Sequence, residues 1–417
     1  MAGTGIDTSI LHKGAHSASY FDLSRSAGEG VEIVDFCIPC NPYFPTPEMF
    51  DELSRDLKNI LKYYPSDSSS ITKKLCSVLG LHPQTVAMAN GSTELITWID
   101  HLLIKESVAI PIPTFGRWTD QPLETGKRVD MFPLQERDGF RLNLDDYVRF
   151  IRDRGSRVAV VCNVNNPDGC YLPRRDVIRF MDMLGDLDLV IIDESFIDFS
   201  DLEQYPSVGP DAVIRSNAIV LKSLGKNFGL HGIRFGYLMA NPAIAGKIGK
   251  ALPKWNLNSL AEKVVFMIQE HEDEYEDSLR LLSRDRRAMA GELARIPGLT
   301  VFPSQGNFIL VKLPTEWSGT ALRDHLVANH GVYTRECGNK LGMTSQFMRL
   351  VVRPARDVDR LIDGMMDYGR QFRVRSYEEP AEPRRGWETP REEAPDNLIQ
   401  YPSRRSGEYT ARRAANA

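Results

Sequence analysis

The sequence predicts an α/β fold with two units, a large domain built on a mainly parallel sheet and a smaller α/β domain. Between residue 65 and about residue 240, short apolar runs alternate with helical patterns, which is typical of βαβ units. A second, shorter series of strand-like and helix-like segments follows residue 295. The length of 417 residues accommodates both units.

The first expected element is a helix that begins at Pro47. Apolar residues such as Met49, Leu53 and Leu57 recur at helical spacing. The pattern stops before Pro65, because the residue that precedes a proline disfavours helical backbone. Six strands of the large domain are then expected at 85–88, 107–111, 157–162, 189–192, 218–221 and 236–239.

The smaller unit is expected to begin with one long, charged helix from about residue 260 to residue 295. The segments after it are a strand at 307–312, a helix at 319–330, a strand at 348–352 and a last helix at 355–370. Beyond residue 373 the chain is rich in Pro, Arg, Glu and Ser, and it holds too few apolar residues to offset the entropy of ordering. The sequence therefore predicts disorder for residues 374–417.

Composition and charge exclude several classes of protein. The formal net charge of −5 argues against a nucleic-acid-binding surface, which is usually basic. No apolar run approaches the roughly 20 residues of a membrane helix, and the first residues lack the features of a secretion signal. Cys37 and Cys40 form a C-x-x-C, but no second ligand pair accompanies it, so it predicts neither a metal nor a redox site. We therefore expect a cytoplasmic protein that binds no metal, membrane or nucleic acid.

Polar segments follow three of the predicted strands, at the ends where open α/β sheets bind ligands. The strand at 157–162 leads into NVNNPDG, the strand at 189–192 into DESF, and the strand at 218–221 into KSLGKNFGLHGIRFGY. A fourth segment, NGSTE at 90–94, opens an amphipathic helix, and free backbone N–H groups at such a start bind anions. The sequence predicts that these four segments form one site.

Together the four segments supply a lysine amine, a carboxylate, an asparagine, an arginine and an anion-binding turn. This set matches a cofactor that carries an aldehyde, a ring nitrogen and a phosphate. The amine bonds the aldehyde, and the carboxylate keeps the ring nitrogen protonated so that the ring accepts electrons. Pyridoxal 5'-phosphate (PLP) has these three groups. Each motif alone is an ordinary turn or a surface charge, and the prediction rests on their joint occurrence in order.

The same segments resemble the motifs of the fold type I PLP-dependent enzymes of the class I/II aminotransferase family. SLGKNFGLHGIRFGY resembles their S-x-x-K-x-x-x-x-x-G-x-R-x-G, NVNNPDG their N-P-N-N-P-T-G, DESF their D-E-A-[YF] and NGSTE their phosphate turn. The most similar branch holds histidinol-phosphate aminotransferase and threonine-phosphate decarboxylase. The resemblance covers roughly residues 30 to 370 and implies a mainly parallel seven-stranded sheet sandwiched by helices.

The pattern and the resemblance together predict five parts of the chain. These are an N-terminal arm (1–30), the N-terminal part of the small domain (31–64), the large PLP-binding domain (65–262), the small C-terminal domain (263–373) and the tail (374–417).

The resemblance implies a role for each matching residue. Lys226 would form the Schiff base and move the proton at the substrate's α-carbon, Asp193 would pair with the pyridine nitrogen, and Arg349 would hold the substrate carboxylate. The other expected cofactor-binding residues are Asn166 at the ring hydroxyl, Phe115 on the ring face, Gly91, Ser92, Thr93, Ser223 and Arg234 at the phosphate, and Tyr64 at the phosphate of the neighbouring subunit. Tyr64 thus implies a homodimer with shared active sites.

Three residues near these motifs have no role in the cofactor's chemistry. Lys222 has no counterpart in the family pattern, and we interpret it as a solvated charge at a strand end. Arg117 and Trp118 are candidates for contacting the substrate side chain.

The expected activity is transamination at the α-carbon of an L-amino acid, with an amino acid that bears phosphate or phosphonate as one candidate. Decarboxylation is the alternative, because His12-Lys-Gly14, DESFIDF and PKWNLNSLA are similar to segments of threonine-phosphate decarboxylase. A non-catalytic binding protein with this fold is the second alternative, against which the intact Lys226 argues. Phe196 departs from the family pattern, since many aminotransferases have a tyrosine there.

Overall fold

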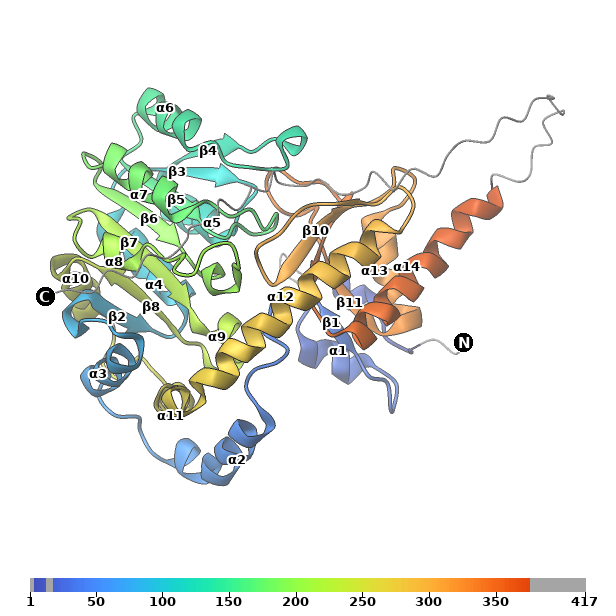
Figure 1. The fold of residues 1–417 in the computed structure, drawn as a ribbon, viewed down its shortest axis with the longest axis horizontal. Coiled ribbons are helices and arrows are strands. Elements are labelled where there is room, and N and C mark those ends of the chain that lie inside the picture. The colour runs from blue at the N-terminus through green and yellow to red at the C-terminus, as the bar shows by residue number, and fades with distance from the viewer. Residues whose placement is uncertain (1–3, 13–17, 376–417) are drawn as a thin grey trace, which may run out of the picture.

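Two sheets organise the chain in the computed structural model, which describes residues 4–12 and 18–375 (Figure 1). The larger sheet has the strand order β2-β8-β7-β6-β5-β3-β4. Its strands are β2 (Val86–Ala89), β3 (Ser107–Ile112), β4 (Arg128–Pro133), β5 (Val158–Cys162), β6 (Leu189–Asp193), β7 (Ala218–Ser223) and β8 (Gly236–Ala240). Strand β8 is antiparallel to both of its neighbours, and the pairs from β7 to β4 are parallel. The mainly parallel seven-stranded sheet is confirmed.

Both faces of the larger sheet are buried, as a parallel sheet requires. Along β7, Ala218 and Val220 belong to one apolar core, whereas Ile219 and Leu221 belong to the core on the opposite face. The helices of this part are α3 (Ser68–Leu79), α4 (Ser92–Leu103), α5 (Arg117–Glu124), α6 (Leu144–Arg154), α7 (Arg174–Met183), α8 (Gly209–Ala212), α9 (Leu224–Asn227), α10 (Pro242–Ala251) and α11 (Ser259–Met267).

Helix α2 (Pro47–Lys62) has the boundaries that its sequence dictates. Thr46 caps its start by accepting a hydrogen bond from the N–H of Met49, and Pro47 occupies the first turn, where its missing N–H does no harm. Tyr63 already has extended backbone, because Pro65 follows closely. The helix packs against α11.

The smaller sheet joins the two ends of the described chain. Its order is β1-β11-β12-β10-β9, with β1 (Val34–Phe36), β9 (Thr300–Val301), β10 (Phe308–Lys312), β11 (Val332–Glu336) and β12 (Phe347–Val351). Strand β1 pairs in parallel with β11, and the remaining pairs are antiparallel. The helices of this part are α1 (Tyr20–Ser26), α12 (Glu272–Ala294), α13 (Gly319–His330) and α14 (Ala355–Arg375). Figure 1 shows α12 running from beside α11 to the smaller sheet.

The sequence was wrong about the charged helix expected at 260–295. A 3-10 turn at Ile268–His271 separates α11 from α12. Helix α12 starts with Glu272, Asp273 and Glu274, and acidic side chains at a helix start stabilise it by interacting with the helix dipole. This acidic triplet indicates the start of a second helix, which the apolar periodicity alone did not reveal.

Two further expectations end where the described residues end. Helix α14 continues to Arg375, so the disorder expected from residue 374 was wrong for residues 374 and 375, where the last helix is longer than predicted. The rest of the expected tail, residues 376–417, lies outside the described residues. Lys13 and Gly14 also lie outside them. No helix in the described ranges is long and apolar enough to span a membrane. The domain boundaries stay predictions.

Candidate active site

The carboxyl ends of three adjacent strands bring the predicted motifs together. Strands β5, β6 and β7 are neighbours in the larger sheet, and Asp193 is the last residue of β6. The buried carboxylate of Asp193 accepts a hydrogen bond from Trp118 Nε1 at 2.8 Å and another from the Ser195 N–H at 3.0 Å. These two donors fix the direction in which the carboxylate points. Trp118 is fully buried, so the expectation that it contacts the substrate was wrong.

Lys226 lies in α9, directly after β7, between two aromatic rings. Its Nζ is 5.0 Å from the ring centre of Phe196 and 6.0 Å from that of Phe115. Burial lowers the pKa of Lys226 to about 8, and the charges of Arg234 and Arg349 act in the same direction while Asp193 opposes them. A lysine with such a pKa is partly neutral near pH 8, and the neutral amine is the nucleophile.

A second feature of the site is an anion cradle at the start of α4. Gly91 precedes this helix, and no side chain caps the free N–H groups of its first turn. A Cβ on Gly91 would lie 2.6 Å from Arg234 Nη2, so glycine is what lets the guanidinium approach the helix start. Ser92 and Ser223 are both buried near this helix start. Gly236 of β8 lies beside both of them, because it pairs with Ser223 and packs closely against Ser92. Arg234 has no carboxylate within ion-pair distance among the described residues.

Arg349 occupies the opposite side of the site, on β12 of the smaller sheet. Its Nη1 donates to Asn166 Oδ1 at 2.8 Å, and its Nη2 donates to the carbonyl of Cys37 at 2.5 Å. Its buried Nε has no hydrogen-bond partner. Arg349 is therefore fixed in place with one donor still unsatisfied, and burial lowers its pKa.

A cavity of about 640 Å³ lies between Arg349 and the first turn of α4, and its lining does not include Lys226, Asp193 or Arg234. Its lining contains the predicted residues Thr93, Phe115, Asn166 and Arg349. Tyr64 does not line it: its side chain is 82% exposed and packs on Trp255 with ring centres 5.3 Å apart. A contact of Tyr64 with a neighbouring subunit stays a prediction.

The same cavity contains two cations that the sequence did not indicate. Arg335 of β11 lies directly opposite Arg349 in the neighbouring strand, and Lys340 donates from Nζ to the carbonyl of Thr114 at 3.0 Å. Burial, together with the charge of Arg349, lowers the pKa of Lys340 to about 8. Within the described part of the chain, neither Arg335 nor Lys340 has a carboxylate partner. Their position depends on strand register, which no local motif encodes.

Arg117 also lines this cavity, as the sequence proposed for a substrate contact. It is less available than the other cations, because Glu124 lies 3.1 Å from its Nη1.

Lys222 is buried, so its interpretation as a solvated strand-end charge was wrong. Its Nζ lies 2.9 Å from Asp198 Oδ1 and 3.3 Å from Glu194 Oε2. Burial disfavours the charged amine, but the two carboxylates outweigh it and raise the pKa of Lys222. Asp198 also accepts a hydrogen bond from Asn227, the residue after Lys226. The lysine thus ties the end of β6 to the turn that carries Lys226.

The chain belongs to the aminotransferase class I and II family, whose model matches residues 31–365. It is 28% identical over 367 residues to an L-serine phosphate decarboxylase of Campylobacter jejuni, covering 85% of this chain and 93% of the relative. It is 27% identical over 278 residues to a histidinol-phosphate aminotransferase of Ruminiclostridium cellulolyticum, covering 66% and 76%. A solved decarboxylase from Sulfurospirillum multivorans superposes with a TM-score of 0.77 at 28% identity, covering 85% of this chain and 92% of that one.

The family is one of PLP-dependent enzymes, so this chain is an enzyme and PLP is its cofactor. The residues present fit that cofactor. The glycine-lined helix start beside Arg234 offers donors to a phosphate. The amine of Lys226 and the oriented carboxylate of Asp193 lie at adjoining strand ends, where an aldehyde and a ring nitrogen would need them.

Proposed function

We propose that this enzyme decarboxylates an L-amino acid whose side chain ends in a phosphate or phosphonate group. The observation that carries the substrate class is a group of three cations in the cavity lining, Arg335, Lys340 and Arg349, which lack carboxylate partners among the described residues. The lining also holds two acids, Asp120 and Glu124, of which Glu124 pairs with Arg117. The carboxylate of an ordinary amino acid needs one of these cations. A phosphate dianion accounts for the other two, since arginine and lysine are its usual partners.

Two findings support decarboxylation over transamination, which the sequence placed first. The C. jejuni relative is named as a decarboxylase of a phosphorylated amino acid, and the chain covers nearly all of that protein. The solved S. multivorans structure is also that of a decarboxylase. Transamination remains the second candidate, because a histidinol-phosphate aminotransferase is similar over two thirds of the chain. The non-catalytic alternative is set aside, since the family consists of enzymes.

Each cofactor-binding role expected from the sequence is part of the proposal. When bound, PLP supplies an electron sink for the bond that breaks at the α-carbon. Lys226 would bond the aldehyde, and Asp193 would keep the ring nitrogen protonated. The phosphate would be held by Gly91, Ser92, Thr93, Ser223 and Arg234, while Asn166 would donate to the ring hydroxyl, Phe115 would cover the ring and Tyr64 of a second subunit would reach the phosphate.

The substrate-binding roles fall to the smaller sheet. Arg349 holds the α-carboxylate, and the contacts of its guanidinium with Asn166 and Cys37 keep that carboxylate from rotating. Arg335 and Lys340 hold the side-chain phosphate. After carbon dioxide has left with the carboxylate carbon, Lys226 in its protonated form places a proton on the α-carbon, and the product is a phosphorylated amine.

A homodimer is also proposed, on the basis of one exposed apolar surface. Phe50 and Leu61 on α2 are 48% and 73% exposed, and Tyr64 and Trp255 lie next in the same region. A second copy covering this surface would bring Tyr64 to the neighbouring cradle. Sedimentation analysis tests the dimer, and a Tyr64→Ala variant that binds PLP as tightly as the wild type would contradict the shared site.

The test of the proposed function is a product assay on the PLP-loaded enzyme. O-phospho-L-serine and O-phospho-L-threonine are compared with L-serine, and both released carbon dioxide and conversion of PLP to its amine form are measured. We expect carbon dioxide from a phosphorylated substrate and none from L-serine. Conversion of the cofactor without carbon dioxide would establish transamination instead, and equal rates with L-serine would contradict the phosphate site.

A further inference from the structure

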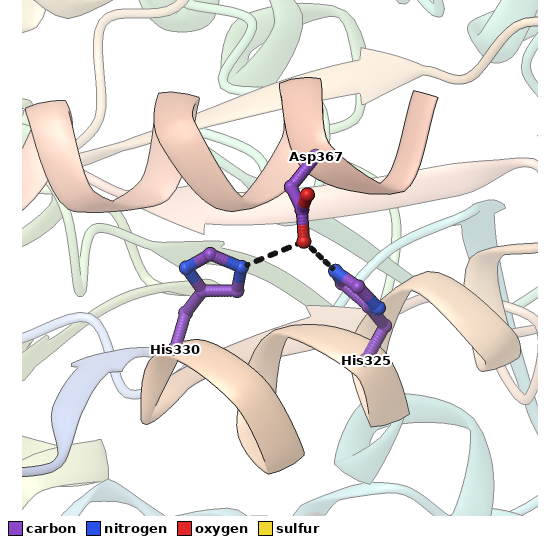
Figure 2. A group of neighbouring side chains, drawn as sticks. All are labelled: His325, His330 and Asp367. Atoms are coloured by element: carbon purple, nitrogen blue, oxygen red, sulfur yellow. Dashed lines mark hydrogen bonds and ion pairs between the residues drawn. The ribbon is translucent and has the colours of Figure 1, made fainter. Parts of the chain in front are cut away.

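A cluster of two histidines and one aspartate lies outside the active site, between α13 and α14. Figure 2 shows His325 and His330 pointing from α13 toward Asp367 on α14. The Asp367 Oδ2 is 3.2 Å from His325 Nε2 and 3.4 Å from His330 Nε2. The three atoms all lie within 4.8 Å of one another. They are ligand types that divalent transition metals take in proteins.

We propose that His325, His330 and Asp367 bind one divalent transition-metal ion, such as Zn²⁺, with water as the fourth ligand. The distances suit such an ion. Zinc bonds of about 2.0–2.2 Å at tetrahedral angles place neighbouring ligand atoms about 3.4 Å apart. The two histidine-to-aspartate separations already have this value to within 0.2 Å.

A second observation argues that the cluster is more than a pair of hydrogen bonds. The Nε2 of His325 is a buried atom without a hydrogen-bond partner, although Asp367 Oδ2 lies only 3.2 Å away. The ring nitrogen and the carboxylate are therefore near each other without the alignment of a hydrogen bond. Buried polar atoms are rarely left unsatisfied, and a cation bound at this nitrogen would satisfy it.

The rings of both histidines are held in place before any ion arrives. His325 Nδ1 lies 3.0 Å from the side-chain amide of Asn329, and its ring centre lies 5.4 Å from that of Tyr368. The Nδ2 of Asn329 faces His325 Nδ1 in the structure, and turning this amide by 180° places its oxygen there to accept the Nδ1–H. Nε2 is then free to bind metal, and the Asn329 oxygen makes the usual outer contact of a metal-bound histidine. Gly364 gives His330 its room, because a Cβ there would lie 3.1 Å from the imidazole.

The side chains around the cluster also suit a cation and leave one side of the site open for it to enter. The side chain of Asp367 is 45% exposed, whereas those of the histidines are 13% and 10% exposed, so the site is open on its carboxylate side. Among the described residues Arg370 is the one arginine or lysine that pairs with Asp367, and it lies 3.9 Å from the other oxygen, Oδ1. Arg360 donates to the backbone carbonyl of His330 and leaves the imidazole free.

The position of the cluster suggests what the ion does. His330 is the last residue of α13, and Gly331 leads directly into β11, the strand that carries Arg335. An ion shared by α13 and α14 would fasten two helices of the smaller sheet at the point where this strand begins. Its role is structural, and it takes no part in the proposed chemistry.

The experiment is a calorimetric titration of metal-free, PLP-loaded protein with ZnCl₂. We expect one site per chain that is at least tenfold weaker in His325→Gln and in Asp367→Asn, and unchanged in the control His101→Gln, an exposed histidine on α4. The Asp367→Asn variant alters a half-exposed side chain, so it tests the site even if His325→Gln fails to fold. Zinc should raise the thermal midpoint of the wild type and leave that of Asp367→Asn unchanged.

Substitution with Co²⁺ distinguishes this site from a cysteine site. Nitrogen and oxygen ligands give weak visible bands, whereas thiolates such as Cys37 and Cys40 add intense charge-transfer absorption in the near ultraviolet. An absence of zinc binding, binding that both variants retain, or a thiolate spectrum would each overturn the proposal.

Discussion

The substitution Gly91→Ala tests the anion cradle most directly, because the structure gives two separate reasons why glycine is required. The backbone there has φ 85° and ψ 162°, a region that residues with a side chain hardly ever adopt. In addition, the new Cβ would lie 2.6 Å from Arg234 Nη2 and 3.1 Å from its Cζ. The guanidinium would have to retreat by about 0.8 Å before the contact reached an ordinary 3.4 Å.

These two effects act on different quantities. The strained backbone lowers the free energy of unfolding by about 1–3 kcal/mol. The displaced arginine would lose its proposed hydrogen bond to the cofactor phosphate, and such a bond is worth about 1.5–3 kcal/mol for a charged pair. Since 1.4 kcal/mol is a factor of ten, the Kd for PLP should rise about 10- to 150-fold.

The assay is a titration of the apoprotein with PLP, followed by the absorbance of the bound chromophore, beside urea unfolding of the same samples. Gly80→Ala is the matched control, because Gly80 also has positive φ but no atom within 4 Å of its Cβ position. That variant should lose stability and keep its PLP affinity. If Gly91 acts through Arg234, the double variant Gly91→Ala/Arg234→Ala binds PLP no more weakly than Arg234→Ala alone. Wild-type affinity in Gly91→Ala, or fully additive losses, would refute the reasoning.

Three further predictions follow from other contacts. Replacing Arg335 or Lys340 by glutamine should raise KM for a phosphorylated substrate at least tenfold and leave the Kd for PLP unchanged; a change in PLP affinity alone would contradict the assignment. Because the pKa of Lys226 is lowered to about 8, labelling of its amine in the apoprotein should increase with pH and be half-maximal near pH 8, whereas paired Lys222 stays unlabelled; a midpoint near 10.5 would show an unperturbed amine. Lys222→Met should lower the free energy of unfolding by about 3–5 kcal/mol in urea, since it leaves the carboxylate of Glu194 buried and unpaired, while a surface lysine such as Lys105 gives less than about 0.5 kcal/mol.

Much of the larger sheet could be predicted because each of its central strands is a short apolar run with a turn signal beside it. Strands β5, β6 and β7 lie within a residue or two of the expected ranges. Strand β4 was missed because it is an edge strand with exposed positions, Arg128 first among them, and lacks the apolar run of a buried strand. Strands β1 and β9 are only three and two residues long, so they form by pairing and leave no pattern of their own.

The residues of the candidate site fall into two groups in the same way: those that a local pattern predicts and those that only strand pairing positions. The cofactor residues come from turns at the ends of local βα units, and their spacing in the sequence is fixed by the turn itself. Gly91 next to Ser92 and Lys226 eight residues before Arg234 are such cases. The proposed substrate cations instead depend on the pairing of β11 with β12, which sets Arg335 opposite Arg349. Register is set by tertiary packing, so no sequence motif shows it.

This division has a consequence for the reaction itself. The bond that breaks at the α-carbon is decided by how the substrate is held, and the proposed holders of both its anionic groups, Arg335, Lys340 and Arg349, belong to the smaller sheet or to the loop between two of its strands. The cofactor machinery of the larger sheet is common to the two candidate reactions. Asn166 is the one residue of the larger part to which Arg349 donates a hydrogen bond in the described structure. A change in the smaller sheet that moves the α-carboxylate relative to Asn166 should therefore shift the ratio of decarboxylation to transamination without weakening PLP binding. On the proposed roles, the choice between the two reactions rests on cations that strand register, and not a motif, positions.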